Sequence, residues 1–166
     1  MPYEPWQPGM LVTASRLAAI SPTWQDWTPV WSTTSGSATP SFGDASITAR
    51  YAVAARTVHF RLEISFGATT NFGGGGTSDN WQFSVPITAA SSMLITGMGE
   101  IELSGPSSRM PVRARLNSPS QFVVECSGRR YDDTAPSSSG IIDASTPWTW
   151  ASGSAIRLAG TYEAAA

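Results

Sequence analysis

The sequence predicts an all-β protein: a jelly-roll-like β-sandwich of about eight strands, with an extended N-terminal arm and one short helix. Two observations lead to this prediction. From Trp31 onward, apolar and polar residues alternate with a period of two, as half-buried strands require. Gly, Pro and Ser interrupt this alternation roughly every 8–12 residues, which is typical of sandwiches and barrels. The length of 166 residues fits a single domain.

Residues 1–31 differ from the rest and are predicted to form the arm, with residues 32–166 as the sandwich domain. Prolines at positions 2, 5 and 8 favour an extended backbone. Thr13 is a suitable N-cap for a helix over residues 14–20, which Ser21-Pro22 ends. The arm cannot bury its own large apolar side chains, so we expect neighbouring subunits to cover them. The expected interface residues are Trp6, Leu11, Leu17, Trp24, Trp27 and Trp31.

The strands are assigned from the alternation. The clearest one runs from Val58 to Phe66, where apolar residues alternate with polar residues such as His59 and Glu63. Residues 92–103 read either as one strand bent at Gly97 or Gly99, or as a hairpin pair. Further strands are expected at residues 47–53, 81–86, 110–116, 121–126 and 154–162.

The charge balance excludes several classes of partner. The net charge is −2, and all ten basic residues are Arg. Without a basic excess, we expect neither nucleic acid nor an anionic membrane surface as a partner. No apolar run approaches the ~18 residues of a membrane span. The N-terminus lacks the basic and apolar regions of a signal peptide, so we expect synthesis in a cytoplasm without that export signal.

Residues suited to catalysis or metal binding are few and scattered. Cys126, the single cysteine, falls in a strand-like run and is expected to be a buried, inert thiol. His59, the single histidine, faces away from the core side of its strand. Asp132-Asp133 and the pair Glu100 and Glu102 come nearest to a metal-binding set, but their spacing fits a solvated surface better. Among twelve acidic residues, no pair stands out as the carboxylates of a glycoside hydrolase. We therefore expect no enzyme activity, no metal and no cofactor.

The seven tryptophans are the strongest signal in the sequence. Tryptophan removes much apolar area from water at low entropy cost, so it fills both cores and subunit interfaces. Stacking on sugars is the alternative. Trp148 and Trp150 would point to the same side of a strand, which makes them the candidates for binding a glycan.

Short segments rich in Trp, Gly, Thr and Pro are spread over nearly the whole chain. They are Trp6-Gln-Pro-Gly9-Met-Leu-Val-Thr-Ala14, Trp27-Thr-Pro-Val-Trp31, Arg50-Tyr51, Ile64-Ser-Phe-Gly67-Ala-Thr-Thr70, Phe72-Gly73, Trp81-Gln-Phe-Ser-Val-Pro86, Ser145-Thr-Pro-Trp148 and Gly160-Thr-Tyr-Glu163. Together they resemble small β-domain structural proteins of tailed phages of actinobacteria. The first segment resembles the N-terminal part of phage tail-fibre-like and other virion proteins.

The resemblance implies a virion component without catalytic residues. Of the roles open to such a protein, we expect capsid decoration, in which the arm docks on the shell and the sandwich faces outward. The expected partners are further copies of the chain, as a homotrimer, and the major capsid protein or other virion proteins. The alternative is a tail fibre or receptor-binding head that recognises glycans on the host cell surface.

Overall fold

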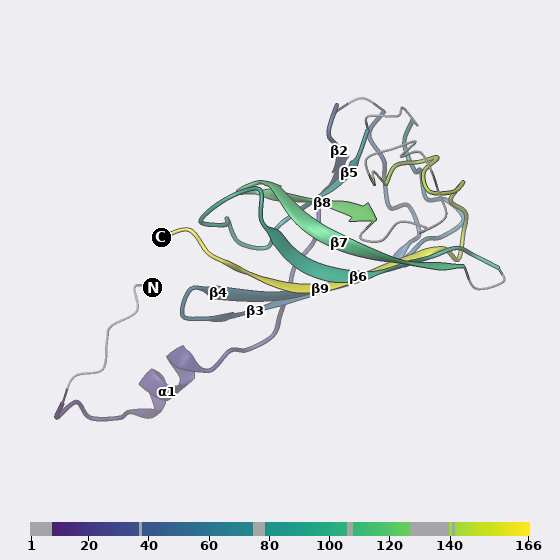
Figure 1. Cartoon of the computed structure of the whole chain (residues 1–166). Coiled ribbons are helices and arrows are strands. Elements are labelled where there is room, and N and C mark those ends of the chain that lie inside the picture. The colour runs from purple at the N-terminus through teal and green to yellow at the C-terminus, as the bar shows by residue number, and fades with distance from the viewer. Residues whose placement is uncertain (1–7, 37, 75–78, 106–107, 127–139, 141) are drawn as a thin grey trace.

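The computed structural model describes residues 8–36, 38–74, 79–105, 108–126, 140 and 142–166. Within these residues the protein is one short helix followed by a single curled antiparallel sheet of nine strands (Figure 1). The elements are α1 (Ala14–Ile20), β1 (Gln25–Asp26), β2 (Trp31–Thr33), β3 (Ser46–Ala54), β4 (Thr57–Ser65), β5 (Trp81–Ser84), β6 (Ile95–Glu102), β7 (Arg109–Ser118), β8 (Gln121–Cys126) and β9 (Ala155–Glu163).

The two edge strands of the curled sheet follow one another closely in the chain. Its strand order is β1-β3-β4-β9-β6-β7-β8-β5-β2, so β1 and β2 form the two edges, and only residues 27–30 separate them in the chain. The amide of Trp27 still donates to the carbonyl of Ala49 on β3, at 3.0 Å. The carbonyl of Val30 already accepts from the amide of Ser84 on β5, at 2.9 Å. Residues 25–33 therefore run from one edge of the sheet to the other.

The core fills the inside of this curl. On β4, Val58, Phe60, Leu62 and Ile64 are buried while the residues between them are more exposed, because successive side chains of a strand point to opposite faces. β9 pairs with β4 along its whole length and adds further apolar side chains to the same interior. At one end the interior is aromatic and contains Trp31, Phe66, Phe72, Trp81, Phe83 and Trp150.

The structure confirms the all-β class and the helix over residues 14–20. Residues 95–102 form one strand with an irregular register between Ile95 and Gly97, as in the bent-strand reading rather than the hairpin. The two separate sheets of a jelly roll are not confirmed, because all nine strands pair into one sheet.

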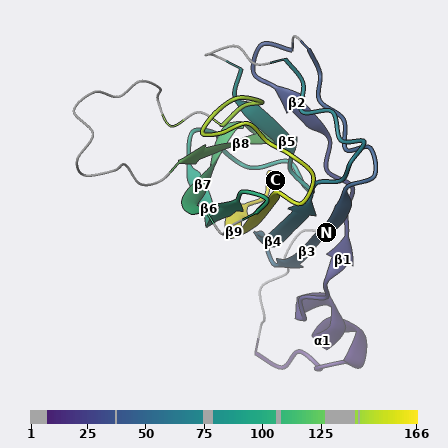
Figure 2. The same ribbon diagram turned by 90° about the vertical axis from the view of Figure 1, so that its right-hand side faces the viewer.

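The sheet begins earlier than the sequence analysis predicted. The expected boundary between residues 31 and 32 falls inside β2, and β1 already pairs with β3 at Gln25 and Asp26. These two strands are short and Pro29 interrupts them, so they carry little of the alternation that marks the others. The part that stands away from the sheet is residues 8–24, which we call the arm from here on (Figures 1 and 2).

Candidate functional site

The arm carries a short helix that the sheet does not support. The hydroxyl of Thr13 caps α1 by accepting from the amide of Arg16 at 3.3 Å, and the hydroxyl of Ser21 donates to the carbonyl of Leu17 at 2.9 Å. Among the described elements, α1 has no more than marginal contact with any strand, and both views show it clear of the sheet (Figures 1 and 2). A helix of seven residues is too short to be stable alone in water. It needs a surface to pack on.

Three of the predicted arm residues are exposed as an interface would require. Leu11 is 77% exposed, Leu17 49% and Trp24 44%, and Val12 beside them is also exposed. Trp24 lies where the arm meets the sheet, since its carbonyl accepts from Nη2 of Arg50 at 3.2 Å. The prediction for Trp6 lies outside the described residues.

Trp31 does not lie on the arm and Trp27 is only partly exposed. Trp31 is 4% exposed, and its ring packs against Trp81 with centroids 4.8 Å apart. Trp27 is half-buried against the core. The expectation that neighbouring subunits cover Trp31 is therefore wrong, because the closing of the sheet buries this side chain within its own chain.

Trp148 and Trp150 do not form an exposed platform for a sugar. Trp150 is 4% exposed, its indole N–H donates to the carbonyl of Asp143 at 2.8 Å, and its ring contacts Trp81 with centroids 4.8 Å apart. Trp148 lies next to Trp150, with centroids 5.6 Å apart, and is itself partly buried. The strand expected to carry both side chains is wrong, because residues 148–150 lie in the loop before β9. The ring of Trp150 is not free to stack on a ligand.

A second exposed apolar surface lies at the start of β6. Met93, Leu94, Ile95 and Met98 are each more than half exposed, and we call these four residues the β6 patch. Met93 has a positive φ of 65°, which breaks the alternation and turns consecutive apolar side chains outward. The sequence analysis assigned this run to a strand and did not predict its exposure. The signal that could have shown it is three consecutive large apolar residues where strict alternation would have placed a polar one.

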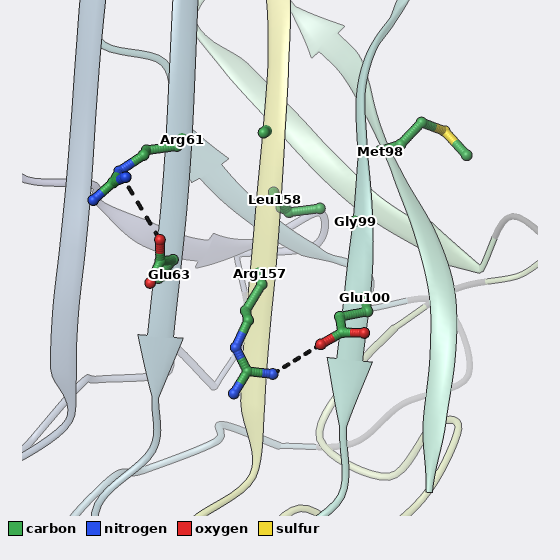
Figure 3. A pocket seen from close by; sticks show the side chains of 8 residues that line it. Arg61, Glu63, Met98, Gly99, Glu100, Arg157 and Leu158 are labelled. Carbon is green, nitrogen blue, oxygen red and sulfur yellow. Dashed lines mark hydrogen bonds and ion pairs between the residues drawn. The ribbon is translucent and has the colours of Figure 1, made fainter. Parts of the chain in front are cut away.

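Beside the β6 patch, a shallow groove crosses the outer face of the sheet (Figure 3). Its floor includes Ala159 on β9, which pairs with Arg61 on β4 and with Met98 on β6. The side chains of Arg61 and Met98 leave the strands on either side of β9 and point away from it (Figure 3). The groove has a volume of about 510 Å³ and is open to solvent.

The charged residues around the groove are paired with one another. Arg157 donates to Glu100 at 3.0 Å and to Glu102 at 2.6 Å, and Arg61 lies 3.9 Å from Glu63 (Figure 3). Hydrogen bonds from Arg157 and Arg109 lower the pKa of Glu102. These pairs leave the groove without a surplus of either charge, so it offers no electrostatic reason to select a charged ligand.

A second ion-pair cluster lies on β7 and β8, next to the β6 patch. Glu125 accepts from Arg113 at 3.0 Å and from Arg115 at 2.6 Å, and its side chain is only 8% exposed. Burial by itself would raise the pKa of Glu125, but the hydrogen bonds from Arg115 and Arg113 outweigh it and lower the pKa. Ile95 and Met98 lie directly opposite Arg115 and Arg113 on the neighbouring strand, so the cluster forms a rim of the β6 patch.

The remaining candidates for chemistry stay apart from one another. His59 pairs across the sheet with Ala52 and Thr161. Burial raises the pKa of the Cys126 thiol, which disfavours the reactive thiolate. Among the residues that the structure describes, no three His, Cys, Asp or Glu side chains gather as a metal site would require. In the same residues no helix has the length and apolar character needed to cross a membrane. Asp132-Asp133 lies outside the described residues.

Comparison with protein families, with curated proteins and with solved structures finds no significant match to this chain. Among the described residues, the arm and the β6 patch are the two surfaces where exposed large apolar side chains gather.

Proposed function

We propose that the chain is a non-enzymatic structural protein of a phage virion, made in the host cytoplasm, that decorates the capsid by docking its arm on neighbouring subunits. The observation that carries this proposal is the arm itself. It holds a capped helix and large apolar side chains away from a sheet whose core is complete without them.

Apolar side chains exposed on the arm are unfavourable in water, and assembly would bury them. Covering apolar surface stabilises a complex by about 25 cal/mol per Å², before the entropy of ordering the arm is subtracted. Leu11, Leu17 and Trp24 offer such surface, and a helix that cannot stand alone gains its packing partner only in the complex.

The capsid enters the proposal through the resemblance to virion proteins of tailed actinobacteriophages. In a decorated shell the chain would dock on the major capsid protein through its arm and through contacts between neighbouring copies, and the curled sheet would face outward. As part of the same proposal, the two halves of the curled sheet act as the two layers of a jelly-roll-like sandwich, and the decorating unit is a homotrimer. The burial of Trp150 counts against the tail-fibre alternative, which needs an exposed aromatic surface for glycans.

Deletion of residues 1–24 tests the proposal. This deletion keeps β1 and the whole sheet, whereas a cut after residue 31 would remove a core tryptophan. Binding of the purified variant to undecorated capsids is measured by co-sedimentation, after its thermal unfolding has shown that the sheet is intact. We expect binding to fall at least tenfold, and the double variant Leu11→Ser/Leu17→Ser to show the same loss. Thr23→Ser, which removes one methyl group at an exposed arm position and keeps the hydroxyl, is the control. Undiminished binding of the deletion variant contradicts the proposal.

A further inference from the structure

We propose that the β6 patch and its adjoining groove receive the arm of a second copy of this chain. The inference rests on the proposed function, since it names the surface on a neighbouring decoration subunit that the arm contacts.

The exposed large apolar side chains of the described residues fall into two groups. One is the arm, with Leu11, Val12, Leu17 and Trp24, and the other is the β6 patch; Val30 alone belongs to neither. The first group is on a segment that projects from the molecule, and the second lies on the flank of the sheet. A projecting apolar segment and an apolar surface with a groove are complementary in shape and in polarity.

The groove suits a single bulky apolar side chain. It is an open surface groove of about 510 Å³, and its lining includes Arg61, Met98 and Ala159. Methionine side chains at Met93 and Met98 are flexible enough to adapt to an inserted leucine or tryptophan.

Charge also matches the arm to this surface. The arm carries one formal charge, Arg16, over residues 8–24. Around the groove, Arg157 is held by Glu100 and Glu102, and the arginines beside the β6 patch share Glu125. A strongly acidic or basic partner would have to compete with these pairs, whereas a nearly uncharged apolar segment leaves them intact.

A second copy fits better than the arm of the same chain. The arm leaves the sheet at β1, and β3, β4 and β9 separate β1 from β6, a path of roughly 19 Å at ~4.8 Å per strand. To reach the patch within one chain, the arm would cross polar side chains such as Thr48 and His59 on the outer face. In both views α1 instead points away from the sheet. Arm-to-patch contact between copies is heterologous, and it gives a ring such as the expected trimer where the rotation between copies closes.

Cross-linking between two single-cysteine proteins tests the contact. In a Cys126→Ser background, one preparation carries Leu17→Cys and the other Met98→Cys, and the mixture is oxidised mildly. We expect the mixed disulfide, identified by mass spectrometry, in at least tenfold higher yield than with Ser152→Cys, an exposed position in the loop before β9. Equal yields overturn the proposal. A double variant, Leu17→Cys/Met98→Cys, that closes within one chain at monomer mass overturns it as well.

Sedimentation of the purified full chain gives an independent measurement. We expect concentration-dependent self-association, with Met98→Glu raising the midpoint concentration at least tenfold. Val30→Glu is the matched control, because it places the same charge at an exposed apolar residue outside both groups, and it should leave the midpoint unchanged. A chain that stays monomeric at all concentrations, or an oligomer that ignores Met98→Glu, contradicts the inference. Capsid binding is measured separately. If the chain is a monomer and still binds capsids through its arm, only this inference is refuted. If the chain self-associates but does not bind capsids, only the proposed function is refuted.

Discussion

The indole ring of Trp31 stacks on the phenyl ring of Phe66, with centroids 5.4 Å apart and an angle of 27° between the planes. Trp31 belongs to β2, at one edge of the sheet, whereas Phe66 follows directly after β4, near the other edge. The contact therefore spans the interior of the curl and holds its two halves together.

Replacing Trp31 tests how much this contact stabilises the fold. We expect Trp31→Ala to lower the free energy of unfolding by about 3–5 kcal/mol, because it leaves a large cavity among the aromatic rings. Denaturant titration followed by tryptophan fluorescence or circular dichroism measures the change. Trp24→Ala, which removes an exposed indole, should cost far less. Similar losses for the two variants would show that Trp31 does not hold the sheet closed.

Close approach of two backbones makes Gly99 sensitive to any side chain. A Cβ at this position would collide with the carbonyl oxygen of Arg157 on the neighbouring strand β9. We expect Gly99→Ala to destabilise the protein by about 1–3 kcal/mol, as forced overpacking usually does. Gly36→Ala is the control, since a Cβ there meets nothing within 4 Å and only the positive φ of 69° opposes it. The thermal midpoint of Gly99→Ala should be the lower of the two, and the reverse order would disprove the collision.

The ion pairs of Glu125 predict a loss of stability in acid. Because the folded state lowers the pKa of Glu125, its contribution is present above the ordinary glutamate range and disappears as pH falls through the folded pKa. We expect Glu125→Gln to cost about 1–3 kcal/mol at neutral pH, the usual loss of a hydrogen bond to a charged group. The difference from the unsubstituted protein should shrink in acid. Urea titrations at several pH values measure it, with Glu63→Gln as an exposed control; a pH-independent difference would exclude the ion-pair explanation.

Tyr162 predicts the opposite dependence at alkaline pH. Burial raises its pKa to about 12, while its hydroxyl donates to the carbonyl of Ile87 at 2.7 Å. The folded protein therefore keeps a proton that the unfolded chain releases near pH 10, so stability should decline as pH rises above that value. Ultraviolet absorbance of tyrosinate should show one late-titrating tyrosine, absent in Tyr162→Phe. If that variant retains the late step, another tyrosine is responsible.

Much of the secondary structure was predictable because its signals are local. Thr13 and Ser21-Pro22 mark the two ends of α1, and the alternation around Val58 marks β4 almost to the residue. The exposed leucines of the arm were predictable for the same reason, since no segment near them could cover them. The β6 patch was not predicted, because its exposure depends on the positive φ of Met93 and on the register of β6 against β7.

The residue pattern alone decided the class, the helix and most strand positions, since the periods of strand and helix are properties of neighbouring residues. Tertiary structure decided which tryptophans are exposed. Trp24 and Trp31 look alike in the sequence, but the chain crosses from β3 to β5 between them, so one lies in solvent and the other in the core. That distinction depends on hydrogen bonds to Ala49 and Ser84, residues far along the chain, and no local pattern contains them.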